Sequence, residues 1–151
     1  MTIEIGQQAP EFTLKNQHGE EISLASFRGR PVVVVFYPFA FTGVCTGELC
    51  EIRDNLEELN TAGAEIVAVS CDSHFTLRVF AEREGYEFNL LSDHWPHGAT
   101  ASAYGVFNDQ VGAAIRGTFV IDAEGVVRWK IENGLPDARS MDDYRAALAA
   151  L

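Results

Sequence analysis

Basic residues are scarce in this sequence. Its 151 residues include 11 Lys and Arg against 22 Asp and Glu, which gives a formal net charge of −11 and an isoelectric point near 4.6. A surface of that charge repels phosphate backbones and anionic lipid headgroups. We therefore expect neither a nucleic acid nor a membrane surface as a partner.

Long hydrophobic runs are also missing. The longest lies around Val32–Tyr37, far short of the roughly 20 residues that a membrane-spanning helix needs. The first residues have neither the positive start nor the apolar stretch of a secretory signal peptide. We expect a cytoplasmic protein.

Cysteine is rare. The three cysteines, Cys45, Cys50 and Cys71, form an odd set, which in a reducing compartment argues against a structural disulfide framework. At least one thiol is therefore expected to be free for chemistry.

The chain does have the composition of a globular domain. Hydrophobic residues make up 47% and charged residues 22%, close to the averages for soluble domains. The length suits one domain and is short for two, and no repeat or linker interrupts it. We expect a single domain over residues 1–151.

The apolar pattern of the first half predicts alternating strands and helices. A hairpin is expected over 12–24, followed by a strand over 32–37 that is buried on both faces because its apolar residues do not alternate with polar ones. Apolar residues spaced by three, four and three positions along 49–59 predict one helix from Thr42 to about residue 62. A second buried strand is expected over 66–70.

The second half continues this order. It predicts a capped helix over 72–84, a short strand over 88–91, a helical turn over 101–104, an antiparallel hairpin over 117–131, and a last helix capped by Ser140. This order describes an α/β sandwich of the thioredoxin kind, with a central mixed sheet flanked by helices and an N-terminal β-hairpin.

The most informative residue is Cys45, in the first turn of the expected helix, with Thr42 placed as its N-cap. Unpaired N–H groups and the helix dipole stabilise an anion there, which favours the nucleophilic thiolate form. Pro38 lacks an N–H and can shield one side of the site from water. The Thr42 hydroxyl can donate to or accept from a bound oxygen.

In the segment from Pro38 to Glu48 the sequence resembles the peroxiredoxin family. Pro38, Thr42 and Cys45 match the signature Pro-x3-Thr-x2-Cys, and Glu48 matches the acidic residue that often follows. Arg116 fits the arginine that the family places on a later strand. The alternatives from the residues alone are a structural cysteine at position 45, a surface ion pair for Arg116, and a simple helix-favouring role for Glu48.

The resemblance covers nearly the whole chain. The strings at 39–43, 91–98 and 103–107 look most like the alkyl hydroperoxide reductase E type of actinobacteria, which usually works with one cysteine. It implies a thiol-dependent peroxidase for hydrogen peroxide, organic hydroperoxides and peroxynitrite, with a sulfenic acid formed on Cys45. It further implies a homodimer, an external reductant such as thioredoxin, mycoredoxin or mycothiol, and no metal, flavin or nicotinamide.

Cys50 departs from the one-cysteine type. The spacing Cys45-x4-Cys50 is that of Q-type peroxiredoxins, in which the second cysteine resolves the sulfenic acid as a disulfide. Residues five apart in a helix have Cα atoms about 8.6 Å apart, beyond the ~6.8 Å limit for a disulfide, so the first turns would have to unwind. The alternative is a small residue on the helix flank. Cys71 is expected to be a buried side chain, with a redox role as its alternative.

Two alternative functions would also use a reactive thiol at Cys45. A thiol-disulfide oxidoreductase needs Cys-x-x-Cys, but position 48 is Glu48. A redox sensor would use Cys45 without turnover. His94 and His97 are weak evidence for a metal, and Trp95 between them fits a place beside the active site, a subunit contact or the core.

Overall fold

The computed structural model describes residues 3–133 and 138–151. Within them, one mixed sheet has the strand order β2-β1-β5-β4-β3-β8-β9. The strands are β1 (Thr13–Asn16), β2 (Glu21–Ser23), β3 (Val32–Phe36), β4 (Glu65–Ser70), β5 (Asn89–Ser92), β6 (Phe107–Asn108), β7 (Ala113–Ala114), β8 (Arg116–Ile121) and β9 (Val127–Asn133). The helices are η1 (Leu24–Phe27), α1 (Gly43–Asp54), α2 (Leu56–Thr61), α3 (His74–Glu84), α4 (Ala99–Ala103) and α5 (Met141–Ala149).

The centre of the sheet is parallel and its flanks are antiparallel. β3 and β5 both run parallel to β4, whereas β1 pairs antiparallel with β5 and β8 pairs antiparallel with β3. The mixed sheet, its flanking helices and the N-terminal hairpin of β1 and β2 confirm the predicted fold class. Among the described residues, no helix is long and apolar enough to cross a membrane.

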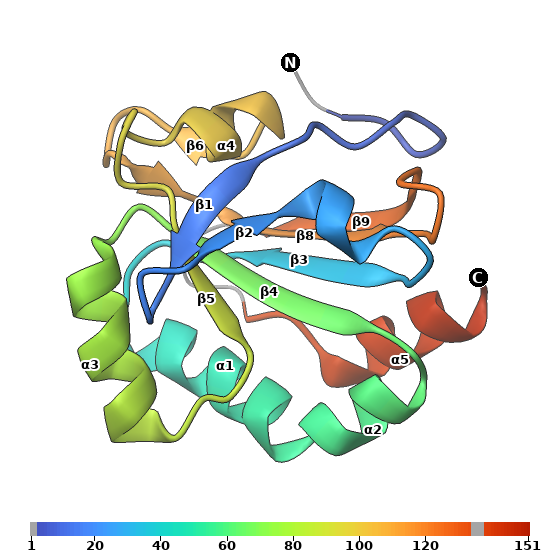
Figure 1. Ribbon diagram of the computed structural model, residues 1–151, viewed down its shortest axis with the longest axis horizontal. Coiled ribbons are helices and arrows are strands. Elements are labelled where there is room, and N and C mark those ends of the chain that lie inside the picture. The colour runs from blue at the N-terminus through green and yellow to red at the C-terminus, as the bar shows by residue number, and fades with distance from the viewer. Residues whose placement is uncertain (1–2, 134–137) are drawn as a thin grey trace.

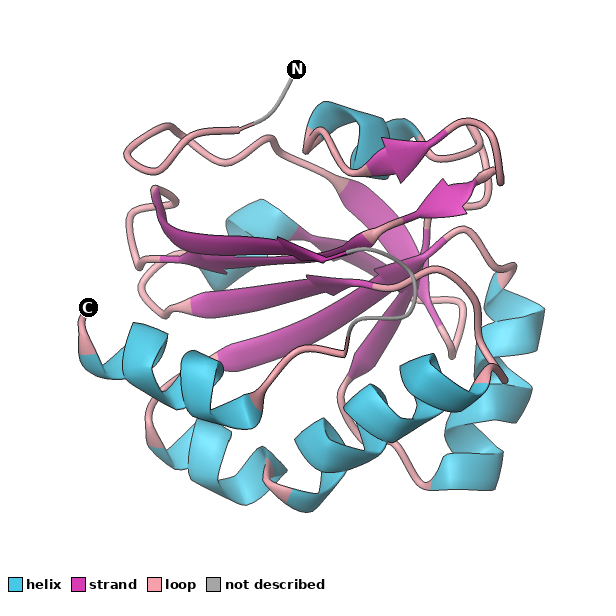
Figure 2. Cartoon of the chain, turned by 180° about the vertical axis from the view of Figure 1, so that it is seen from behind, coloured by secondary structure: helices cyan, strands magenta, loops and turns pink. Residues whose placement is uncertain are grey.

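The sheet separates two apolar layers, with α1, α2, α3 and α5 on one side of it and α4 on the other (Figures 1 and 2). Val33 and Val35 of β3 face the layer covered by α1, α2, α3 and α5, and Val32 and Val34 face the layer that contains η1 and α4. All residues of β3 are buried. The absence of alternation in this strand therefore predicted its two-sided burial correctly.

The predicted helix from Thr42 to about residue 62 is wrong in one respect. The chain forms two helices, because Asn55 leaves helical geometry with φ −114° and ψ 13°. Its side-chain amide donates to the carbonyl of Glu51 at 2.8 Å, a local bond that competes with regular helix. The spacing of apolar residues in the sequence does not reveal such a side-chain bond.

The small antiparallel pair β6 and β7 was not predicted. It joins Phe107 to Ala114 and Asn108 to Ala113 and lies beside α4 on the far side of the sheet from α1 (Figure 1). Strands of two residues are too short to show a period in the sequence.

Candidate active site

Cys45 lies at the start of α1, directly beyond the loop that follows β3. Thr42 is the N-cap residue, with φ −88° and ψ 151°, and Thr46 is bonded back to the Thr42 carbonyl at 2.9 Å. The backbone N–H groups of the residues before Thr46 in the first turn, including that of Cys45, have no acceptor within the helix. Cys45 is only 1% exposed, so its sulfur is buried at this end of the helix.

Arg116 is the direct partner of that sulfur. Its Nη1 donates to Cys45 Sγ at 3.2 Å and to Glu48 Oε1 at 2.7 Å. Arg116 begins β8, the strand that pairs with β3, so sheet pairing brings the arginine to the helix that follows β3. At 3% exposure, Arg116 is not part of a surface ion pair.

A second arginine, Arg139, completes the cluster, and sequence reasoning missed it. Its backbone N, Nε and Nη2 donate to the Glu48 carboxylate at 2.6, 2.9 and 2.9 Å. Its Nη1 donates to the carbonyls of Phe36 and Gly117 at 2.6 and 2.9 Å. Arg139 therefore joins Glu48 to the ends of β3 and β8. An arginine in the loop before a capped helix carries no signal of burial in the sequence.

The charged groups of this cluster leave a net positive charge beside Cys45. Burial by itself would raise the pKa of Glu48, but the hydrogen bonds and charge of Arg139, together with the charge of Arg116, hold that pKa below its ordinary value. Glu48 is therefore a carboxylate. Two guanidinium groups and one carboxylate leave one net positive charge, and Arg116, one of the two guanidinium groups, contacts the Cys45 sulfur.

Thr42 and Pro38 lie in the segment between β3 and Cys45. The Thr42 hydroxyl makes no capping bond, contrary to a simple N-cap role, and instead donates to the carbonyl of Phe39 at 2.9 Å. Its oxygen is thereby oriented to act as an acceptor. Pro38 is buried two residues after the end of β3. Phe41 has a left-handed φ of 68°, and its ring packs against Phe80 at 4.9 Å.

Comparisons with known proteins agree with this arrangement. The family model described as AhpC/TSA family matches residues 5–130. The chain belongs to the AhpC/TSA family. It is 43% identical over 152 residues to alkyl hydroperoxide reductase E of Mycobacterium tuberculosis, covering 98% of this chain and 99% of the relative. It is also 38% identical over 147 residues to the chloroplastic peroxiredoxin Q of Sedum lineare, covering 97% and 78%.

Solved structures give the same result. The chain superposes on Enterococcus faecalis AhpC with a TM-score of 0.91 at 26% identity, covering 99% of this chain and 92% of that one. For the peroxidoxin BcpB of Mycobacterium tuberculosis the TM-score is 0.88 at 32% identity, covering 99% and 98%. The resemblance to both types is thus confirmed, and this peroxiredoxin is a thiol-dependent peroxidase.

The other two cysteines of the peroxiredoxin have different surroundings. All three are free thiols. Cys50 is half-buried, with its Sγ 3.4 Å from the hydroxyl of Tyr86 and 3.8 Å from Oε2 of Glu84. Burial raises the pKa of Cys71 to about 12, with Asp93 and Asp72 adding to the rise. Cys71 is therefore a protonated thiol at neutral pH.

The histidine pair does not gather further metal ligands. Among the residues that the structure describes, no three His, Cys, Asp or Glu side chains lie in a metal-binding group. His94 Nδ1 lies 3.3 Å from the Cys71 carbonyl, and His97 Nε2 lies 2.7 Å from the Gly112 carbonyl. Trp95 is 83% exposed, so it does not fill the core.

Proposed function

We propose that Cys45 is the nucleophile of the peroxidase reaction, supported by Arg116, Thr42, Pro38 and Glu48. The observation that carries this proposal is the 3.2 Å hydrogen bond from Arg116 to the Cys45 sulfur at the start of α1. No comparable cation touches Cys50 or Cys71 in the contacts described above. The proposed site therefore joins a buried sulfur to two sources of positive potential, a guanidinium and a helix N-terminus.

In the reaction, the Cys45 thiolate attacks the terminal oxygen of a hydroperoxide ROOH. An S–O bond forms as the O–O bond breaks, the departing RO⁻ takes up a proton and leaves as ROH, and the sulfur becomes a sulfenic acid. The sulfur is oxidised by two electrons and the peroxide is reduced by two. Cys45 thus carries the whole redox change.

The surrounding groups act on the charge that develops along the O–O bond. Arg116 and the N–H of Cys45 offer donors, and Thr42, whose proton is directed to Phe39, offers its oxygen to the O–H of the hydroperoxide. Glu48 positions Arg116 rather than touching substrate. One preorganised donor of this kind is commonly worth about 3–4 kcal/mol in the transition state.

Cys50 is the proposed resolving residue. Its sulfur would attack the Cys45 sulfenic acid to form a disulfide, which an external thiol reductant then reduces. Thioredoxin, mycoredoxin and mycothiol are the proposed reductants, and the cytoplasm, where such thiols keep cysteines reduced, is the proposed compartment. If Cys50 does not react, the same external thiol resolves the sulfenic acid directly.

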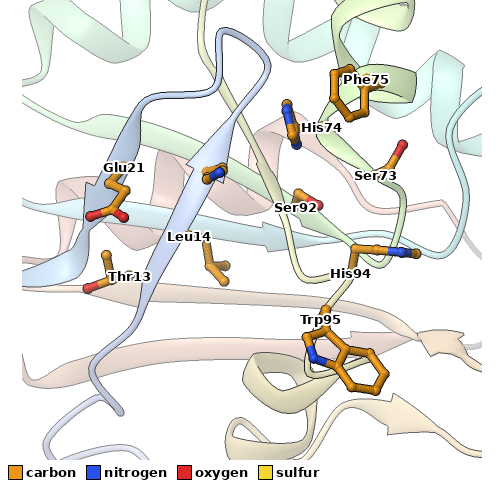
Figure 3. A pocket seen from close by; sticks show the side chains of 10 residues that line it. Thr13, Leu14, Glu21, Ser73, His74, Phe75, Ser92, His94 and Trp95 are labelled. Atoms are coloured by element: carbon orange, nitrogen blue, oxygen red, sulfur yellow. The ribbon is translucent and has the colours of Figure 1, made fainter.

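We also propose that this domain, over residues 1–151, works as a homodimer. A cavity of about 520 Å³ is lined by Phe75, His94 and Trp95, among others (Figure 3). Phe75 is 70% exposed and Val79, one turn later on α3, is 55% exposed. Large exposed apolar groups that gather in this way are typical of protein contacts. Light scattering should give a dimer mass for the wild type and a lower mass for Trp95→Glu; a dimer in both would exclude this face.

The experiment that tests the nucleophile compares Cys45→Ser with Cys71→Ser. Serine is nearly the size of cysteine, but its hydroxyl stays protonated at neutral pH. With hydrogen peroxide and a reducing system, Cys45→Ser should lose all turnover and keep the wild-type circular dichroism, while Cys71→Ser should keep turnover. Residual turnover by Cys45→Ser would assign the nucleophile to another residue.

A further inference from the structure

The buried hydroxyl of Tyr86 lies where α1 meets the end of α3. Gly85 ends α3 with a left-handed φ of 72°, and the turn directs Tyr86 beneath α1. The tyrosine is 5% exposed, and its ring packs against Phe80 and Phe88 at centroid distances of 5.1 and 5.2 Å. The ring is therefore held by apolar contacts that do not depend on the hydroxyl.

This hydroxyl bonds to both ends of one helical turn. It donates to the backbone carbonyl of Thr46 at 3.2 Å and lies 3.4 Å from Cys50 Sγ. In an α-helix the Thr46 carbonyl is also the acceptor for the N–H of Cys50. Tyr86 thus ties together the turn that separates Cys50 from Cys45.

The same turn has to open before the two sulfurs can join. Because both cysteines lie within α1, their Cα atoms are about 8.6 Å apart, and a disulfide requires no more than ~6.8 Å. In the bond-forming step the Cys50 sulfur attacks the Cys45 sulfur, the S–O bond of the sulfenic acid breaks, and the hydroxide leaves as water with the Cys50 proton. The peroxide consumed in the first step is the only oxidant needed.

We propose that Tyr86 is a positioning residue that holds the Thr46–Cys50 turn closed and so sets the rate of the Cys45–Cys50 disulfide. This inference rests on the proposed resolving role of Cys50. While the turn stays closed, the sulfenic acid is available to a second peroxide and can be oxidised further to sulfinic acid. Tyr86 therefore controls how the sulfenic acid divides between these two products.

The surroundings of the Tyr86 hydroxyl keep it a hydrogen-bond donor. Burial raises the pKa of Tyr86, and the neighbouring Cys50 and Glu84 raise it further, so the hydroxyl keeps its proton at physiological pH. A second contact between α1 and α3 does not involve Tyr86. Arg53 Nη1 of α1 donates to the Glu84 carbonyl of α3 at 2.6 Å. The later part of α1 is thereby held against α3 independently of Tyr86, and opening is confined to the first turns.

The test is Tyr86→Phe, which removes the hydroxyl and keeps the ring. The matched control is Tyr104→Phe, which removes a buried hydroxyl that donates to the Pro10 carbonyl at 2.7 Å in the opposite apolar layer. Each protein receives one equivalent of hydrogen peroxide, or an excess where sulfinic acid is measured, and quenched samples are mapped by mass spectrometry. Amide hydrogen exchange of residues 46–50 is measured on the reduced proteins.

Tyr86→Phe should form the disulfide about five-fold faster than wild type, the factor expected for one lost hydrogen bond. The oxidation rate of Cys45 should stay within about two-fold, sulfinic acid should decrease, and the amides of residues 46–50 should exchange faster. Tyr104→Phe should match the wild type in all four. A structural defect would not speed one step and leave the preceding one unchanged.

Disulfide formation at the wild-type rate, or more slowly, in Tyr86→Phe would overturn the proposal. If Cys45 reaches the sulfenic acid in every protein and no disulfide forms in any, the proposed resolving role of Cys50 is wrong, and so is the proposed role of Tyr86 that rests on it. If Cys45 is not oxidised at all, the proposed nucleophile is wrong. The three failures give different masses on the same peptides.

Discussion

Cys45 and Cys50 occupy one helix, five residues apart, in opposite chemical environments. Cys45 is buried in the first turn and accepts a hydrogen bond from Arg116. Cys50 is half-buried one turn later, between the Tyr86 hydroxyl and the Glu84 carboxylate. The Cys45 sulfur thus accepts a hydrogen bond from a cation. The Cys50 sulfur contacts a hydroxyl and a carboxylate, and Arg53 is close enough to interact with it electrostatically.

The comparison shows that tertiary partners give the two thiols different surroundings. Both cysteines belong to the same α-helix, so local structure alone does not separate them fully. The cation beside Cys45 comes from β8, and the carboxylate that holds this cation is fixed by Arg139. The partners of Cys50 come from α3 and the residue after its C-cap. Removing these partners one at a time tests the difference.

The largest effect is expected from Arg116→Ala, which removes the cation from the Cys45 side. The peroxide step should slow by about 10² or more, the scale of one lost charge-stabilising donor. Single-turnover oxidation followed by stopped flow measures it, with Arg128→Ala, a surface arginine paired with Asp122, as the control. Unchanged single-turnover kinetics would remove Arg116 from the site.

Glu48→Gln should come next, because it leaves two buried guanidinium groups without their shared counter-charge. We expect a loss of about 2–3 kcal/mol in the free energy of unfolding at pH 7, since breaking a buried ion pair is strongly destabilising. Urea unfolding measures this loss. Glu58→Gln, at an exposed carboxylate paired with Arg145, should lose under about 1 kcal/mol.

We expect the difference in stability between wild type and Glu48→Gln to depend on pH in a definite direction. Because the pKa of Glu48 is lowered in the folded state, its stabilisation is complete above the ordinary carboxyl pKa of about 4.3 and is lost as the pH falls through the lower folded value. The stability difference between wild type and Glu48→Gln should be constant from pH 5 to 7 and shrink below pH 4. A difference that stays constant down to pH 3 would contradict an ionised Glu48.

Gly47→Ala should act on the Cys50 side in the opposite sense to Tyr86→Phe. Gly47 lies within α1, and a Cβ added there meets no atom within 4 Å outside the helix. Alanine favours helix over glycine by about 1 kcal/mol, so the turn should open less and the disulfide should form about five-fold more slowly. Quenched mass spectrometry checks this rate; a faster disulfide would show that unwinding does not limit the step.

Cys71→Ala should have the smallest effect. The raised pKa of Cys71 keeps its thiol protonated, and no site residue described above contacts it. Peroxide consumption with a reducing system should stay within two-fold of wild type. A larger loss of turnover, with an unchanged unfolding midpoint, would give Cys71 a redox role.

The fold was predictable because its signals are local. β3 begins with four consecutive valines, Val32–Val35, and ends at Phe36. Ser73 caps α3 by accepting from the Thr76 N–H, and Gly85 ends this helix in a left-handed conformation. The break at Asn55 was missed because it depends on one side-chain bond to Glu51. Such a bond leaves the apolar spacing unchanged.

The site was predictable only as far as its motif extends. Cys45, Thr42 and Glu48 fall within one short string, and Arg116 was found through the family resemblance. Arg139 lies 91 positions from Glu48, and nothing around it in the sequence separates a buried arginine from a surface one. The contact of Tyr86 with Thr46 likewise depends on how α3 packs against α1.

The most direct test of the account maps the first oxidised sulfur. Wild type and Cys50→Ala receive one equivalent of hydrogen peroxide in the presence of dimedone, which traps sulfenic acids, and every peptide that contains a cysteine is analysed by mass spectrometry. We expect a dimedone adduct on Cys45 in Cys50→Ala and a Cys45–Cys50 disulfide that competes with this adduct in wild type. A first adduct on Cys50 or Cys71, with Cys45 unmodified, would contradict it.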